Sequence, residues 1–302
     1  MTQATSPPSD ISDNQDTGYN TRSGTTDPPV SAGLTAKAAA DRATRRSHIA
    51  GAALIFVAIG FVSVALWYSI TSGQGEGGLA PTPAGTWEQL TTILSDPFYV
   101  DGPASVGIFW HMLASLQRVL IGFGIAAAIA IPLGFLLGNS TRIRWAVEPF
   151  VQVLRPVSPL AWLPLGLALL RDSESTAIFV IVMASLWPIL LNTIDGVQKI
   201  NPMYMQLART LEASRSQVVR RIQLPAALPS MVTGLRLSLS TAWLVIIAAE
   251  MLVGSRGMGY FVWNQWNKLS VPAIVVAIVL IGVVGFALDR LVVLSARLVP
   301  HS

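Results

Sequence analysis

The side chains that usually carry catalysis or bind metals are few and widely separated in this sequence. It has no cysteine, and its three histidines, His48, His111 and His301, match no spacing used by zinc sites. Neither a G-x-x-x-x-G-K-[ST] phosphate loop nor a G-x-G-x-x-G turn after a strand is present. The sequence therefore predicts no catalytic site, no metal site and no cofactor, and any ATP that the protein uses must be bound by another chain.

Composition predicts a membrane protein. Hydrophobic residues make up 52% of the 302 residues and charged residues only 12%, whereas soluble domains carry about 25% charged residues. The net charge of +4 could suggest nucleic-acid binding, but the basic residues lie at the ends of apolar runs. That distribution is typical of membrane topology rather than of a binding face.

Six apolar runs are long enough to be transmembrane helices, because about 20 apolar residues cross a bilayer. They cover residues 49–70, 114–138, 147–170, 175–194, 228–253 and 272–294. The first run is long and begins far from the N-terminus, which favours an anchor over a cleaved signal peptide. The third contains Pro156, Pro159 and Pro164, so it is either a broken helix that lines a path or a kinked packing helix. The predicted fold class is all-α, a polytopic membrane protein with six transmembrane helices.

The chain divides into three predicted regions. Residues 1–48 are rich in Ser, Thr, Asp, Pro and Gly, which predicts a disordered tail. Residues 49–110 form an anchor helix and an extracytoplasmic loop, and residues 111–297 form the main transmembrane domain. Lys and Arg concentrate in the tail and in the loops after the second and fourth runs, and loop 71–113 has neither. The positive-inside rule therefore predicts that both termini are cytoplasmic in a bacterial plasma (inner) membrane protein.

One cytoplasmic segment, residues 206–225, is unusually basic for this chain. Ser214 with Gln217 three positions later is a capping-box pattern, so a second short helix is predicted to begin there. Leu224-Pro225 is predicted to end that helix, because the residue before proline disfavours the helical conformation. Two short helices could form a rigid knob for a partner protein, or an amphipathic helix could lie on anionic lipid. Physical reasoning alone leaves both alternatives open.

This segment resembles the permease signature of bacterial ABC importers, E-A-A-x3-G-x9-I-x-L-P. Ala208 takes the third position of the signature, and Ile222, Leu224 and Pro225 take its end. Glu212 occupies the glycine position, where glycine tolerates a positive φ better than other residues. Further resemblance lies in "ASLQRVLIGF", "LRPVSPLAWLPL", "WPILLNT", "TGLRLSL" and "AAEMLVG". These stretches resemble the nitrate, sulfonate and taurine importers, and "DPFYVDGPASVGIFWHML" and "GMGYFVWNQWNKLS" are most similar to the nitrate/nitrite and bicarbonate branch.

The resemblance covers about residues 85–297 and implies the type I ABC importer permease fold, with 111–297 as the permease domain. It implies a separate ATP-binding subunit, an extracytoplasmic substrate-binding protein and a second permease copy in a homodimer, with no nucleic-acid partner. The segment that would contact the ATP-binding subunit comprises Gln206, Leu207, Ala208, Arg209, Leu211, Glu212, Ala213, Ser214, Ile222, Leu224 and Pro225.

The function that the resemblance implies is ATP-driven import of a small oxyanion, nitrate or nitrite first, with sulfonate, taurine or bicarbonate as alternatives. An ion-coupled secondary transporter is the alternative of another class, although no inverted repeat is visible. An intramembrane enzyme would need a nucleophile or acid–base cluster that the sequence lacks.

Polar and aromatic residues within the predicted spans are candidates for a translocation path, because ionisable groups are costly in a membrane. The candidates are Arg155, Pro159, Trp162, Asn192 and Glu250. Arg118 and Arg236 lie near the ends of their runs, so we expect their side chains to reach the lipid headgroups.

Overall fold

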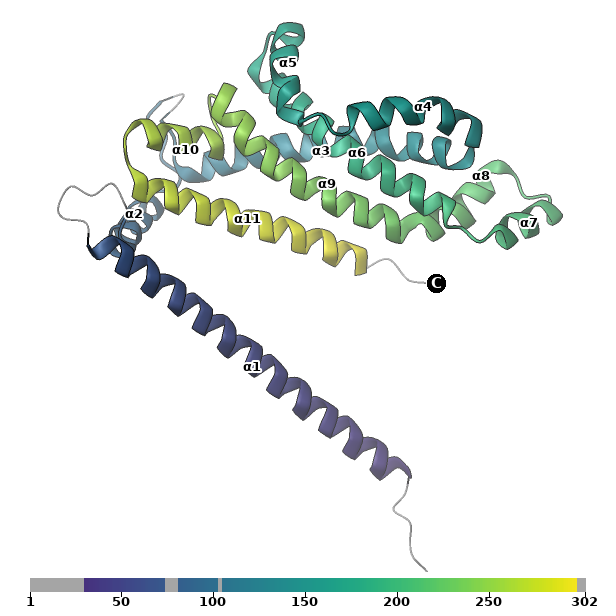
Figure 1. Cartoon of the computed structure of the whole chain (residues 1–302), viewed down its shortest axis with the longest axis horizontal. Coiled ribbons are helices and arrows are strands. Elements are labelled where there is room, and N and C mark those ends of the chain that lie inside the picture. Colours follow the sequence, from purple (N-terminus) through teal and green to yellow (C-terminus); the bar gives the residue numbers. More distant parts are fainter. Residues whose placement is uncertain (1–29, 74–80, 103–104, 298–302) are drawn as a thin grey trace, which may run out of the picture. The chain divides into compact units, whose positions relative to one another are not determined.

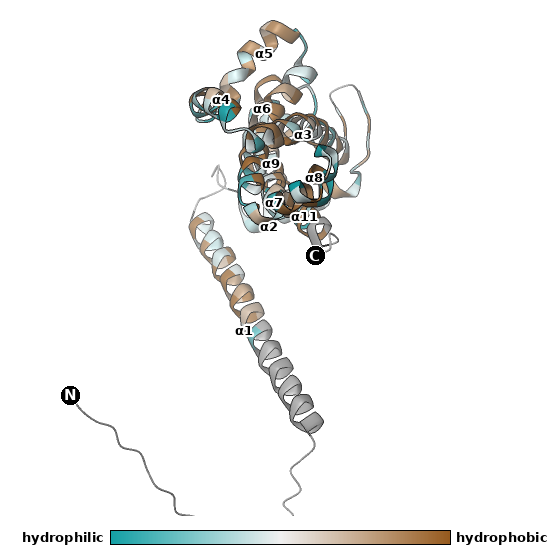
Figure 2. Ribbon diagram, turned by 90° about the vertical axis from the view of Figure 1, so that its right-hand side faces the viewer, coloured by the Kyte–Doolittle hydropathy of each residue, from teal (hydrophilic) through white to brown (hydrophobic). Residues whose placement is uncertain are grey.

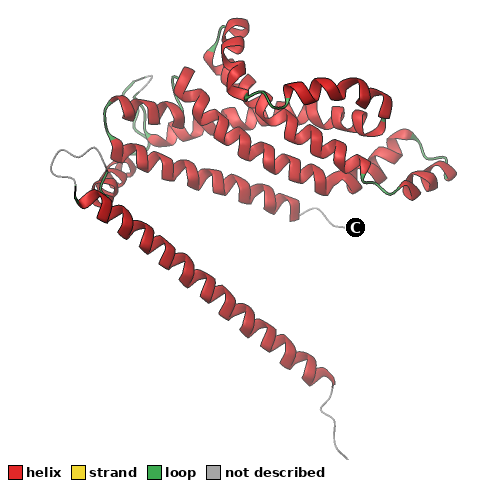
Figure 3. Ribbon diagram, viewed as in Figure 1, coloured by secondary structure: helices red, strands yellow, loops and turns green. Residues whose placement is uncertain are grey.

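The computed structural model describes residues 30–73, 81–102 and 105–297, and its contacts divide the chain into two units, Met1–Ser63 and Val64–Ser302. Its long helices are α1 (Val30–Ser72), α2 (Pro83–Ser95), α3 (Ile108–Asn139), α4 (Thr141–Leu154), α6 (Ser173–Gln198), α9 (Leu224–Val253), α10 (Met258–Asn267) and α11 (Val271–Arg297). Short helices are η1 (Pro159–Trp162), α5 (Leu163–Leu170), α7 (Pro202–Thr210), α8 (Arg215–Val218) and η2 (Val219–Gln223). In these ranges no strand occurs, and Val100 and Val106 form one isolated bridge (Figures 1 and 3). The all-α prediction is confirmed.

Helix α1 begins inside the region that the sequence assigns to a disordered tail. It starts at Val30 and runs through an alanine-rich stretch that has a high helix propensity. Residues 1–29 of the predicted tail lie outside the described residues. The stretch Gly51–Ser72 is apolar enough to cross a membrane.

Five helices in the described residues are long and apolar enough to cross a membrane, and a sixth span is possible if the bent pair counts as one. That pair is Thr141–Leu154 with Pro159–Leu170, and its two parts meet at 91°. Of the two alternatives for the third run, the structure therefore shows the broken helix. The helices also extend beyond the predicted limits of the other runs, since α3 begins at Ile108 and α9 at Leu224.

Helices α3, α6 and α9 form the core of the second unit, and small residues allow them to approach closely. On α3, Gly122 faces Ile181, Gly134 faces Thr193 and Gly138 faces Val197; a Cβ on these glycines would lie 2.6–2.8 Å from the α6 side chains. Such small residues allow helices to pack without a hydrophobic driving force in lipid. Figure 2 views the unit from the side of α7 and α8 and shows these helices packed side by side.

Helix α11 packs on α9 through two polar contacts as well as apolar ones. The indole N–H of Trp243 donates to the Ile281 carbonyl at 3.0 Å. The guanidinium of Arg236 forms a two-point ion pair with Asp289, with distances of 2.5 and 2.8 Å. The charge of Arg236 is therefore paired between two helices, while its side chain remains half-exposed.

Candidate functional site

Helix α7 ends in a backbone motif that forces the chain to turn. The N–H of Glu212 donates to the Arg209 carbonyl and the N–H of Ala213 to the Ala208 carbonyl, both at 3.0 Å. These two bonds define a Schellman cap, whose turning residue adopts a left-handed conformation. Glu212 is that residue, with φ +51°. It makes the bend that glycine would make more easily, so the missing glycine does not remove the turn.

The second short helix begins where the sequence predicts. Ser214 Oγ accepts from the Gln217 N–H, and Gln217 Oε1 accepts from the Ser214 N–H at 2.8 Å. The predicted capping box is therefore confirmed.

The predicted end of this helix at Leu224-Pro225 is wrong. The chain passes through a wide π-type turn over Val219–Gln223 and continues directly into α9. The N–H of Leu224 reaches back five residues to the Val219 carbonyl. Pro225 is then the second residue of α9, and proline is tolerated in the first turn of a helix.

Helix α7 and its C-cap residue expose an apolar surface, which we call the α7 surface. Its members are Met203, Tyr204, Leu207 and Leu211, with exposed fractions between 55% and 72%. Ala208 is not part of it, because its side chain is buried at 4%. Of the residues expected to contact the ATP-binding subunit, Leu207 and Leu211 are therefore exposed, whereas Ala208 packs within the chain.

A reciprocal amide pair fixes this segment to the helix bundle. Gln223 Nε2 donates to Asn139 Oδ1 at 2.5 Å, and Asn139 Nδ2 donates to Gln223 Oε1 at 3.0 Å. Gln223 is buried at the start of α9, and Asn139 is the last residue of α3. The pair therefore connects the short helices to two long ones.

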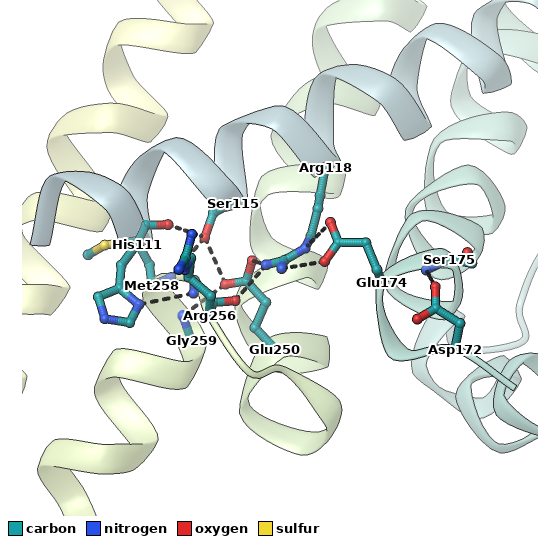
Figure 4. Close-up of polar contacts among 11 residues, drawn as sticks. His111, Ser115, Arg118, Asp172, Glu174, Ser175, Glu250, Arg256, Met258 and Gly259 are labelled. Carbon is teal, nitrogen blue, oxygen red and sulfur yellow. Dashed lines mark hydrogen bonds and ion pairs between the residues drawn. The ribbon is translucent and has the colours of Figure 1, made fainter. Parts of the chain in front are cut away.

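A buried ion cluster lies at the other end of α9 (Figure 4). Arg118 on α3 pairs with two carboxylates, and we call these three residues the Arg118 clasp. Nη1 of Arg118 lies 2.7 Å from Glu250 Oε1. Nε and Nη2 of Arg118 contact the two carboxylate oxygens of Glu174 at 2.8 and 2.6 Å. The side chain of Arg118 is only 6% exposed, so the expectation that it reaches the headgroups is wrong. The side chain can be buried because the carboxylates of Glu250 and Glu174 form ion pairs with it.

The same cluster caps helix α10 with side chains from other helices. Glu250 Oε2 accepts from the Gly259 N–H at 3.0 Å, Ser115 Oγ accepts from the Met258 N–H at 2.8 Å, and His111 Nδ1 accepts from the Gly257 N–H at 3.1 Å. The first N–H groups of a helix have no partner within it and favour a negative charge nearby. Helix α10 therefore depends on α3 and α9 for its cap.

Gly257 is required at this cap for two reasons. Its φ is +131°, which side-chain-bearing residues rarely adopt, and an added Cβ would lie 2.2 Å from the carboxyl carbon of Glu250. Nη1 of Arg118 also donates to the Arg256 carbonyl at 2.6 Å. The loop between α9 and α10 is thus held by Arg118 at Arg256 and by His111 at Gly257.

The predicted path residues lie in or at the ends of α4, η1, α6 and α9. Arg155 is exposed at the C-terminus of α4, and Pro159 and Trp162 lie half-buried in η1. Asn192 is in α6, where its Nδ2 donates to the Pro188 carbonyl at 2.8 Å, and Glu250 is completely buried in the clasp. Glu250 is therefore a structural ion-pair partner in this conformation, not an exposed path residue.

The family of the chain follows from comparison with known proteins. Residues 130–299 match the family model described as "Binding-protein-dependent transport system inner membrane component". The chain belongs to this family. It is an ABC transporter permease, a multi-pass membrane subunit rather than an enzyme, and ATP is hydrolysed by a separate ATP-binding subunit. A substrate-binding protein is the other partner that membership implies.

Individual relatives cover most of the permease. It is 42% identical over 241 residues to the nitrate import permease protein NrtB of Leptolyngbya laminosa, covering 80% of this chain and 85% of that protein. It is 40% identical over 241 residues to the bicarbonate transport system permease protein CmpB of Synechocystis sp., covering 78% and 84%. A solved structure of the MetNI methionine ABC transporter, in an inward facing conformation, matches with a TM-score of 0.55 at 19% identity, covering 62% of this chain and 94% of that one. The last comparison confirms the fold.

Sequence reasoning missed the most connected polar residues of the permease. It assigned Arg118 to the headgroups and did not single out Glu174, Ser115 or Gln223. The clasp and the amide pair join residues between 56 and 132 positions apart. The sequence offered one signal: an arginine and a glutamate within apolar runs would carry a large free-energy penalty in the membrane if they were left unpaired.

Proposed function

We propose that this permease forms the membrane path of an ATP-driven importer for a small oxyanion, with nitrate or nitrite as the first candidate. The observation that supports the substrate is the 42% identity to a nitrate import permease over 80% of this chain. Bicarbonate is the second candidate, because the similarity to a bicarbonate permease is almost as high. Both ions are small, planar and negatively charged, so one path could suit either.

The α7 surface is proposed to bind the ATP-binding subunit. Four large apolar side chains are exposed there beside a rigid turn, and exposed apolar patches mark interaction sites. The amide pair of Gln223 and Asn139 connects this segment to α3 and α9. A movement imposed on α7 and α8 would therefore reach the long helices directly. The proposed contact comprises the α7 surface together with Gln206, Arg209 and Glu212, while Ala208, Ala213, Ser214, Ile222, Leu224 and Pro225 shape the segment.

The proposed topology places α7 and α8 in the cytoplasm, together with both termini. The basic residues of this segment support that orientation under the positive-inside rule. Residues 1–48 are then a cytoplasmic region, 49–110 an anchor with an extracytoplasmic loop, and 111–297 the permease domain. We also propose a homodimer, because the resemblance to type I importer permeases implies a second permease copy.

Uptake measurements in the native bacterium test the substrate. A strain that lacks the gene would be compared with the same strain carrying it, using labelled nitrate, nitrite, bicarbonate and taurine, each as the only added substrate. We expect loss of nitrate or nitrite uptake and of growth on nitrate as the sole nitrogen source. Selective loss of bicarbonate uptake would favour the second candidate. Selective loss of taurine uptake, or no loss for any of these anions, would contradict the oxyanion proposal.

A further inference from the structure

The two ion pairs of the Arg118 clasp differ in the burial of the carboxylate that would lose its partner if the pair opened. Glu250 has a side chain that is 0% exposed, whereas the side chain of Glu174 is 55% exposed. If Glu250 separated from Arg118, a completely buried carboxylate would lose its cation, which is strongly unfavourable. If Glu174 separated, water would solvate its carboxylate and Arg118 would still be paired with Glu250. Opening is therefore far less costly at Glu174.

The two pairs also hold different parts of the permease. The Glu250 pair joins α3 to α9, and Glu250 and Arg118 together hold the backbone of the loop before α10. The Glu174 pair joins α3 to the first turn of α6. That turn is packed against α5, because a Cβ on Gly166 would lie 2.9 Å from Thr176. Helix α5 and the start of α6 therefore form one corner, which we call the α5–α6 corner.

We propose that Arg118 is a two-sided positioning residue of the transport cycle. Its pair with Glu250 stays closed throughout and keeps α3, α9 and the loop before α10 in one rigid block. Its pair with Glu174 opens when the α5–α6 corner moves relative to that block. Because the Glu174 carboxylate is half-exposed and Arg118 keeps its pair with Glu250, losing the Glu174 pair should cost about 1 kcal/mol, which changes the ratio of the two arrangements by up to about fivefold. A change of that size shifts the balance between the two arrangements without locking either of them.

Distances between spin labels can test this proposal, because the chain has no native cysteine. Gln117 in α3, Ser173 at the start of α6 and Ser255 in the loop before α10 are all exposed. Cysteine would replace them in pairs, and labelled permease would be assembled with its ATP-binding subunit and diluted with unlabelled permease. The 117–255 distance reports on the rigid block, and the 173–255 distance reports on the corner.

We expect the 117–255 distance to be the same without nucleotide and with trapped ATP, while the 173–255 distance shifts. Glu174→Gln should populate the shifted 173–255 distance without ATP, by up to about fivefold over the unmodified protein. Asp195→Asn is the matched control, because it removes an exposed ion pair with Lys199 within α6 alone. It should leave both distances unchanged.

Three results would overturn the proposal: a 117–255 distance that changes with ATP, a 173–255 distance that does not, or the same distribution in Glu174→Gln and Asp195→Asn. Uptake of the same variants adds a second measurement. Glu174→Gln should change the maximal uptake rate per inserted molecule, whereas a purely structural role predicts fewer inserted molecules with a normal rate. The distance experiment uses no transported substrate, so its failure is distinct from a failure of the oxyanion proposal.

Discussion

Nη1 of Arg118 lies 2.7 Å from Oε1 of Glu250, although the two residues are 132 positions apart in the sequence. They join α3 to α9 inside a part of the molecule where neither charge could be tolerated alone. The structure therefore predicts that each residue depends on the other for stability.

Arg118→Met should destabilise the permease by about 3–5 kcal/mol, because it leaves Glu250 buried without a cation. The double variant Arg118→Met with Glu250→Met should lose less than the sum of the two single losses. Thermal unfolding of purified permease in detergent and its yield in membranes would measure this. Strict additivity of the two losses would contradict the ion-pair account.

The turn after α7 should become more stable when its strained residue is relieved. Glu212 has φ +51°, a conformation that costs a side-chain-bearing residue about 1–2 kcal/mol. Glu212→Gly should raise the unfolding temperature slightly, and Glu212→Val should lower it. Leu269→Gly is the comparison, since Leu269 has φ 56° at an equivalent turn after α10. A loss of stability in Glu212→Gly would show that the carboxylate makes a contribution of its own.

The α7 surface should be required for coupling to ATP hydrolysis. Leu211→Asp replaces an exposed apolar side chain with a charged one, so it should weaken binding of the ATP-binding subunit without unfolding the permease. Co-purification of the two subunits and uptake per inserted permease would be measured. Ser216→Asp, which adds the same charge on α8 without removing apolar surface, is the control. Equal co-purification of Leu211→Asp and the unmodified protein would remove the α7 surface from the interface. Ala208→Asp is a poor test, because Ala208 is buried.

The amide pair should be worth a measurable coupling energy. Gln223→Ala and Asn139→Ala each remove one side of a reciprocal pair of hydrogen bonds, which contribute about 0.5–1.5 kcal/mol each. A double-mutant cycle on the free energy of unfolding should give a positive coupling energy. Uptake per inserted molecule should fall in both single variants if the pair transmits movement from α7. A coupling energy of zero would mean that the two amides act independently.

Arg155 is the positively charged member of the path candidates and could therefore attract the anion. It is exposed at the end of α4, beside the break in the third span. Arg155→Gln should slow uptake per inserted molecule, and Arg155→Lys should restore part of the rate, since a positive charge is what a passing anion needs. Lower membrane yield with normal uptake per molecule would instead assign Arg155 to packing or to headgroups.

The local structure of the permease could be predicted well where a short-range rule applies. The Ser214–Gln217 capping box, the break in the third span and the apolar helices all follow from residues within a few positions of one another. Local rules also failed in places. Leu224-Pro225 begins α9 instead of ending a helix. The π-type turn of Val219–Gln223 precedes it, so the proline lies in the first turn of α9, where proline is tolerated.

By itself, the sequence determined that this protein is a helical membrane protein, because hydropathy and helix length are properties of each segment alone. That it is a permease was implied by its resemblance to a known family. The signature of residues 206–225 also identified the segment that we assign to the ATP-binding subunit. Only the tertiary structure decided the roles of the buried polar residues. Arg118 could have reached the headgroups from its place in the sequence, and Glu250 could have lined a path. Their pairing arises because folding brings α3 and α9 together, and in a medium with little water a charge must find its partner within the protein.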